Sequence, residues 1–163
     1  MFSRKRKNVQ DTPKIVWHVP EGTGDFLVPK RATDGSMAYD IVAPMDYTIP
    51  PISDPNIGKA VVIDTLIAAT IPRGYAAILG SRSSMASKNL ITVEGGWIDS
   101  DFLGVWKVIL YNHGTSSYKI NSGDRIAQVR FVKVIHLEEE VCFAYPDKTK
   151  TKRGDGGLGS TGR

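Results

Sequence analysis

The sequence predicts an all-β fold, either a closed β-barrel or a jelly roll. Short apolar segments rich in Val, Ile, Thr and Tyr recur along the chain, and turn residues interrupt them about every 8–15 residues. Amphipathic periodicity long enough for a packed helix is missing. Short strands without helices between them favour a barrel or a jelly roll over alternating βαβ units.

The expected elements follow in chain order. Strands are expected within residues 14–19, 39–43, 60–71, 74–80, 89–96, 104–112, 118–120 and 125–135, because Gly, Pro, Asn or Asp separates these apolar segments. Residues 50–58 are expected to form a surface loop, and Ser83–Asn89 is the best helical window. Residues 147–163 contain five Gly and one large apolar residue, Leu158, which predicts a flexible tail.

Length and charge exclude several classes of protein. A chain of 163 residues corresponds to one domain. The net charge of +4 comes from residues 1–31 and 146–163, whereas residues 32–145 hold nine basic and twelve acidic residues, so no specific nucleic-acid partner is expected. The basic run 4–7 is interpreted as a solvated tail, with non-specific attraction to nucleic acid as the alternative. No apolar run approaches the length of a membrane span, so no membrane partner is expected.

Cysteine and histidine content indicates an intracellular protein without a zinc site. Cys142 is the only cysteine, so no internal disulfide is possible, and a cytoplasmic location is expected (the host cytoplasm for a viral protein). Its thiol is expected near the core. His18, His113 and His136 are interpreted as structural or surface residues, and no Cys/His spacing typical of zinc is present.

Three segments carry polar or charged side chains that are candidates for a ligand site. Asp40 is an acid inside an apolar strand, where it is either a structural acceptor or a ligand. The helical window begins with Arg82, Ser83 and Ser84. These residues either form an anion site at a helix N-terminus or include a serine that simply caps the helix. Gln128 enters a later strand and offers its amide to a phosphate.

Two further features lie between residues 94 and 104. Gly95-Gly96 after a strand suggests a hairpin tip at which a ligand can meet bare backbone. Asp99 and Asp101 are two residues apart and would share one face of a strand. They are either a pair that orients water, binds a metal or acts as a base, or plain turn acids.

Five segments in chain order resemble the motifs of the trimeric dUTPases: A-Y-D-I (38–41), S-R-S-S-M-A (81–86), G-W-I-D-S-D-F-L-G (96–104), G-D-R-I-A-Q (123–128) and R-G-D-G-G-L-G-S-T-G (153–162). The resemblance implies a jelly-roll-like distorted β-barrel over residues 21–146, after a basic extension (1–20) and before a flexible Gly-rich arm (147–163). It also implies a homotrimer whose active sites are shared between subunits and closed by the arms.

The resemblance further implies Mg²⁺-assisted hydrolysis of dUTP to dUMP and pyrophosphate, which limits uracil in DNA and supplies dUMP for dTMP synthesis. It assigns Asp99 to orienting the water that attacks the α-phosphorus, and Asp40 to supporting Mg²⁺ through water, the ion sitting mainly on the triphosphate. The substrate-binding positions that it implies are Arg82, Ser83, Ser84, Gly95, Gly96, Trp97, Ile98, Phe102, Lys107, Gln128, Arg153, Leu158, Gly159, Ser160 and Thr161.

The chain departs from the family pattern at a few of these positions. Phe102 stands where the family usually has Tyr, and Ser84 replaces a Gly. Leu158 replaces an aromatic residue that stacks on the base, which predicts a higher KM rather than lost chemistry. Three alternatives are a dCTP deaminase of the same fold family, a regulator that binds a protein partner through residues 1–20 or 51–60, and a β-barrel that binds nucleic acid through its basic ends.

Overall fold

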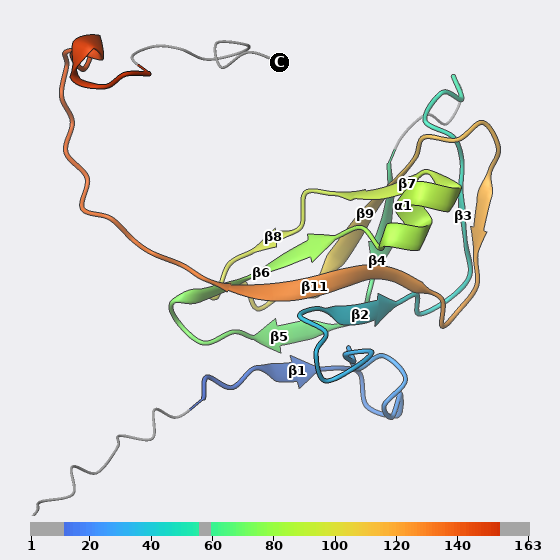
Figure 1. Cartoon of the computed structure of the whole chain (residues 1–163). Coiled ribbons are helices and arrows are strands. Elements are labelled where there is room, and N and C mark those ends of the chain that lie inside the picture. The colour runs from blue at the N-terminus through green and yellow to red at the C-terminus, as the bar shows by residue number, and fades with distance from the viewer. Residues whose placement is uncertain (1–11, 56–59, 154–163) are drawn as a thin grey trace, which may run out of the picture.

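The computed structural model describes residues 12–55 and 60–153. In these ranges the chain forms eleven strands, one short α-helix and one 3-10 helix (Figure 1). The elements are β1 (Val16–His18), β2 (Tyr39–Val42), β3 (Tyr47–Ile49), β4 (Val61–Asp64), β5 (Ala68–Thr70), β6 (Tyr75–Gly80), α1 (Ser83–Asn89), β7 (Ile91–Glu94), β8 (Trp97–Ile98), β9 (Lys107–Asn112), β10 (Tyr118–Ile120), β11 (Arg125–Lys133) and η1 (Lys148–Lys150). The predicted all-β fold is confirmed.

The strands form four antiparallel sheets around one core. The largest sheet has the order β2-β11-β6-β8, a second has the order β4-β9-β7, and two pairs, β1-β5 and β3-β10, complete the set. Alternate aliphatic side chains of each sheet point inward, as Ile41, Ile63, Val108 and Val129 do, and these four are fully buried. Outward-facing residues of the largest sheet therefore remain available for a site.

An aromatic cluster attaches the N-terminal strand to the barrel. The ring of Trp17 in β1 packs edge-on against Tyr39 and Trp106, with centroid distances of 5.9 and 5.4 Å, and lies 5.8 Å from Phe131. β1 lies inside the segment predicted as a basic extension, and its pairing with β5 holds residues 16–18 on the barrel (Figure 1).

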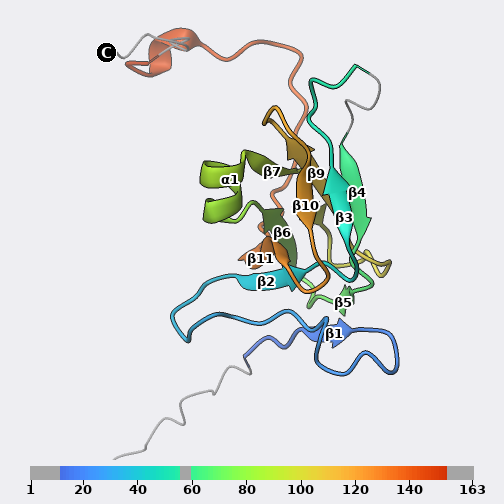
Figure 2. The same cartoon turned by 90° about the vertical axis from the view of Figure 1, so that its right-hand side faces the viewer.

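The helical window is confirmed as α1, but neither serine caps it. The N-cap residue is Arg82, with an extended backbone (φ −80°, ψ 136°), and α1 has no side-chain cap hydrogen bond. The hypothesis of simple N-capping by Ser83 or Ser84 is therefore wrong. The helix lies beside β7 (Figure 2) and buries Met85 against the core.

The strand predictions differ from the structure in the run 60–71, at β3 and at β8, which lies outside every expected strand range. The run 60–71, expected as one segment, splits into β4 and β5 because Leu66 takes a positive φ of 60°. Asp64 Oδ1 fixes this break by accepting a hydrogen bond from the Leu66 amide at 3.1 Å. β3 was not expected, because it is defined by its pairing with the distant β10 rather than by a local apolar run.

The chain leaves the barrel after β11. The segment beyond residue 135 runs away from the sheets in both views (Figures 1 and 2), and the side chains of Phe143 and Tyr145 are 100% and 98% exposed. Cys142 lies on the same segment and is exposed, so the expectation of a thiol near the core is wrong. The part of the chain that the structure describes holds no helix able to cross a membrane.

Candidate active site

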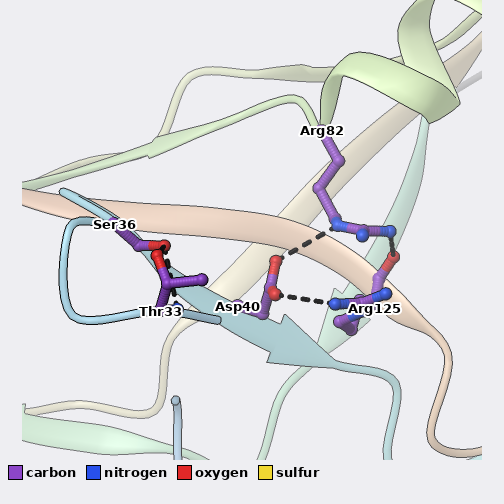
Figure 3. A network of polar contacts seen from close by, with 5 residues as sticks. All are labelled: Thr33, Ser36, Asp40, Arg82 and Arg125. Atoms are coloured by element: carbon purple, nitrogen blue, oxygen red, sulfur yellow. Dashed lines mark hydrogen bonds and ion pairs between the residues drawn. The ribbon is translucent and has the colours of Figure 1, made fainter. Parts of the chain in front are cut away.

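Two arginines converge on one carboxylate of the largest sheet. Asp40 of β2 accepts hydrogen bonds from Arg82 Nε at 3.1 Å and from Arg125 Nη1 at 3.2 Å (Figure 3). Arg82 Nη1 also donates to the backbone oxygen of Arg125 at 3.1 Å. The side chains of Asp40 and Arg82 are 19% and 20% exposed, so their ion pair is partly desolvated. Because these contacts use two of five N–H donors, Arg82 retains donors for an anion.

Gln128 holds the turn that carries Arg82. Its Nε2 donates to the backbone oxygen of Ser81 at 2.9 Å, and Ser81 Oγ accepts a hydrogen bond from the Val93 amide at 2.8 Å. The second N–H of the Gln128 amide remains for a ligand. A cavity of 480 Å³, named here the Asp40 pocket, is lined by Ala32, Ser36, Met37, Ala38, Asp40, Arg82, Ser83, Ser84, Arg125 and Gln128.

Gly95 and Gly96 form a corner between two sheets. β7 pairs with β9 whereas β8 pairs with β6, so the predicted hairpin tip is wrong. Both glycines have positive φ, 68° and 83°. A Cβ on Gly96 would lie 2.6 Å from the Cβ of Leu79, so only Gly fits there. Among the described residues β8 is an edge strand, whose outer backbone groups have no ladder partner.

Asp99 and Asp101 lie in a turn, so the expectation that they share a strand face is wrong. β8 ends at Ile98, and the Phe102 amide donates to the backbone oxygen of Asp99 at 3.2 Å. The Phe102 ring lies close to Gly104, where a Cβ would come within 2.8 Å of its Cζ. A cavity of 270 Å³, named here the Asp99 pocket, is lined by Gly96, Trp97, Ile98, Asp99, Phe102, Val105, Trp106 and Lys107.

Lys107 lies on the wall of the Asp99 pocket, where it pairs with Asp64. Its Nζ is 3.3 Å from Asp64 Oδ2, and both side chains are about half exposed, at 58% and 49%. The Leu66 amide and, to a smaller extent, Lys107 lower the pKa of Asp64, against the opposing effect of partial burial. The ammonium of Lys107 is therefore already engaged by a carboxylate.

The predicted site residues fall into two separate pockets of one chain. The Asp40 pocket collects the expected phosphate-binding side chains, and the Asp99 pocket collects most of the expected nucleoside-binding ones; the two share no lining residue. Gly95 lines neither pocket. Arg153 lies on the exposed segment after β11. Leu158, Gly159, Ser160 and Thr161 lie outside the described residues, as does the basic run 4–7.

A family model for dUTPase matches residues 25–162 of the chain. The chain belongs to the dUTPase family. It is 41% identical over 156 residues to the deoxyuridine 5'-triphosphate nucleotidohydrolase of Ehrlichia canis (strain Jake), covering 93% of this chain and 97% of that protein. It is 36% identical over 135 residues to the mitochondrial human protein of the same name, covering 83% of this chain but only 50% of the human protein. These relatives confirm the predicted enzyme class, dUTP diphosphatase.

Solved dUTPase structures confirm the fold. A mutant dUTPase of Staphylococcus bacteriophage 80alpha with dUpNHpp matches with a TM-score of 0.79 at 23% identity, covering 93% of this chain and 100% of that chain. A mutant dUTPase from phage phi11 of S. aureus, described with a structural Mg(II) ion, matches with a TM-score of 0.70 at 22% identity, covering 82% of this chain and 99% of that chain. The predicted jelly-roll-like barrel thus has the dUTPase fold.

The Asp40 pocket contains one charged side chain that the residue pattern did not assign to a site. Arg125 is the second partner of Asp40 and lines the Asp40 pocket. The signal was available, because Arg125 stands inside the segment G-D-R-I-A-Q. The pairing of β11 with β2 is irregular between Arg125 and Ala127, and the position of Arg125 depends on this irregularity. No local residue pattern predicts it.

The corner glycines of this dUTPase give a matched pair of stability tests. Gly95→Ala is expected to destabilise by about 1–2 kcal/mol, the cost of an L-residue at positive φ. Gly96→Ala carries the same cost plus overlap with Leu79, for a total of about 2–5 kcal/mol. Urea unfolding at one fixed protein concentration measures both. Equal losses in the two variants would contradict the close packing of Gly96 on Leu79.

Proposed function

We propose that the chain hydrolyses dUTP to dUMP and pyrophosphate, in active sites that each join the Asp40 pocket of one copy to the Asp99 pocket of another. The observation that carries the proposal is the separation of the two pockets within one chain, with no lining residue in common. A homotrimer in which each copy presents one pocket to each neighbour supplies three whole sites, because a closed ring of head-to-tail contacts uses every pocket.

In this proposal the Asp40 pocket binds the phosphates. Arg82 offers its remaining N–H donors, Gln128 its second amide N–H, and the hydroxyls of Ser83 and Ser84 lie exposed beside them. Asp40 does not contact substrate directly. It holds Arg82 and Arg125 in place by the two ion pairs, so that both guanidinium groups are oriented before the triphosphate arrives.

The Asp99 pocket binds the nucleoside. The edge of β8 offers backbone N–H and C=O groups to the uracil edge at positions 95–98, and the half-exposed ring of Phe102 offers a face to the deoxyribose. Trp97 is 79% exposed and stands beside them. Lys107 contributes to the wall of the pocket while paired with Asp64.

Asp99 supplies the chemistry at the α-phosphorus. Its carboxylate accepts a hydrogen bond from a water, orients it and takes its proton as the oxygen attacks. A bond forms between this oxygen and the α-phosphorus, while the bond from the α-phosphorus to the bridging oxygen breaks and pyrophosphate leaves. The guanidinium of Arg82 neutralises charge that develops on the leaving phosphates, and the amide of Gln128 stabilises it by a hydrogen bond.

Mg²⁺ fits this site as an ion carried by the triphosphate. Within residues 12–55 and 60–153 no cluster of three His, Cys, Asp or Glu side chains could hold a metal ion directly. Each oxygen of Asp40 accepts one hydrogen bond from an arginine and retains a lone pair for a metal-bound water. Mg²⁺ commonly keeps several waters and binds substrate phosphates, and when bound it neutralises phosphate charge.

The segment after β11 is proposed to carry the arm to a neighbouring copy. The described part of this segment runs away from the sheets of its own barrel (Figures 1 and 2), and its apolar side chains Phe143 and Tyr145 are exposed, as are residues 147–153. In this arrangement Arg153, Ser160 and Thr161 bind the terminal phosphate, while Leu158 and Gly159 cover the base. Residues 1–20 and 51–60 remain the proposed places for a protein partner.

A substrate comparison tests the proposal. Purified protein with Mg²⁺ is expected to release pyrophosphate from dUTP, and far more slowly from dCTP, dTTP and UTP. Ammonia release from dCTP would favour the deaminase alternative instead. Absence of turnover on dUTP, in protein shown to be folded, would overturn the proposed function and leave the regulator and nucleic-acid alternatives.

A further inference from the structure

A second small cavity continues from the Asp40 pocket along β11. It has a volume of 240 Å³ and shares Met37, Ala38 and Gln128 with the Asp40 pocket. Beyond Gln128 its walls are residues 78–80 of β6 and Arg130 of β11. We name it the Arg130 pocket. Arg130 does not line the Asp40 pocket itself.

Arg130 and Gln128 point to the same side of the sheet. On β11 they are separated by Val129, which is fully buried, and side chains two residues apart on a strand share a face about 7 Å apart. Gln128 lies opposite Asp40 and Gly80, and Arg130 lies opposite Ile78. A ligand group that binds the second N–H of the Gln128 amide therefore lies where the Asp40 pocket meets the Arg130 pocket.

The charge of Arg130 has no counter-ion in the part of the chain that the structure describes. Arg82 and Arg125 share the carboxylate of Asp40, whereas none of the ion pairs in residues 12–55 and 60–153 includes Arg130. The side chain is exposed, and its neighbour across the ladder is the apolar Ile78. A free guanidinium fork at the edge of a phosphate pocket matches the geometry of a phosphate oxygen pair.

We propose that Arg130 binds a phosphate group of the nucleotide beyond the α-phosphate, as a specificity-determining residue beside Gln128. The inference rests on the proposed function. Because Asp99 acts on the α-phosphate from the other pocket, the phosphates that reach Gln128 and Arg130 are the β- and γ-phosphates. Arg130 then distinguishes a nucleoside triphosphate from the monophosphate product, and so favours release of dUMP.

Binding of two probes to the Arg130→Met variant tests this role. The dissociation constant for dUpNHpp is expected to rise about tenfold or more, the loss of one charge-assisted contact, while that for dUMP changes less than about twofold. Arg130→Lys should recover part of the affinity for dUpNHpp. Lys133→Met removes the same charge from the far end of β11 and should change neither constant. Sedimentation checks the assembly of each variant.

Three binding results would overturn the role of Arg130. They are an unchanged affinity for dUpNHpp, an equal loss for dUpNHpp and dUMP, or a loss reproduced by Lys133→Met, which would indicate only general electrostatics. Dissociation of the assembly in Arg130→Met would instead identify Arg130 as a contact to an acid of a second copy, and would also overturn it. Failure of the wild-type protein to bind dUpNHpp would refute the proposed function itself, so the two failures are distinguishable.

Discussion

Replacement of Asp99 by Asn is expected to reduce kcat about 1,000-fold, since a positioned general base contributes roughly 10²–10⁴ to the rate. The amide keeps the size and turn geometry of the side chain but cannot take a proton from water. Binding should survive, because the Asp40 pocket is untouched and the nucleoside contacts come from other residues. Pyrophosphate release measures the rate, and titration with dUpNHpp measures the affinity.

The control for this substitution lies two residues away. Asp101 occupies the same turn and lines a neighbouring cavity together with Asp99, but it does not line the Asp99 pocket. Asp101→Asn is therefore expected to keep kcat within about tenfold of wild type, because it leaves the general base in place. Full activity in Asp99→Asn, or a larger loss in Asp101→Asn than in Asp99→Asn, would show that the catalytic assignment is wrong.

Replacement of Asp40 by Asn is expected to weaken phosphate binding through the two arginines. The amide of Asn would turn its NH₂ group toward one guanidinium, and its single oxygen could accept a hydrogen bond only from the other. Breaking such a partly buried charge pair costs about 2–5 kcal/mol. We expect kcat/KM for dUTP to fall about 100-fold, most of it in KM, since 1.4 kcal/mol corresponds to tenfold.

Asp25→Asn is the matched control for Asp40→Asn. Asp25 pairs with Lys30 at 3.9 Å, and their side chains are 90% and 64% exposed, so loss of this charge should leave steady-state kinetics unchanged. An Asp40→Asn variant with wild-type KM would contradict the view that Asp40 positions Arg82 and Arg125. A fall in kcat with unchanged KM would instead indicate a direct role near the reacting phosphorus.

The fold could be predicted from the sequence wherever local pattern decides structure. The helical window at Ser83–Asn89 and most strand segments were found, because turn residues and β-branched runs mark them. The break inside 60–71 was missed because it depends on the side chain of Asp64 and the unusual backbone of Leu66. The exposed position of Cys142 was missed because free cysteines are usually buried, whereas this one lies where the chain leaves its own core.

The sequence predicts which residues form the candidate site but not how they are arranged. The resemblance placed Arg82, Ser83, Ser84 and Gln128 together, and the structure places all four in one pocket. That Asp40 is held by two arginines, and that the corner at Gly95-Gly96 joins two sheets, depends on pairing between distant strands. Local residue patterns do not encode such pairing, so these features required the structure.

The central claim is that each active site needs the Asp40 pocket of one copy and the Asp99 pocket of another. Mixing two inactive variants, Arg82→Met and Asp99→Asn, tests it most directly. After co-refolding at equal amounts, random assembly into a closed ring leaves about a quarter of the sites with both pockets intact, so about a quarter of wild-type activity is expected. Mixing Asp99→Asn with a variant that carries both Arg82→Met and Asp99→Asn should restore no activity. Absence of recovery in the first mixture, with mixed assemblies demonstrated, would contradict the shared site.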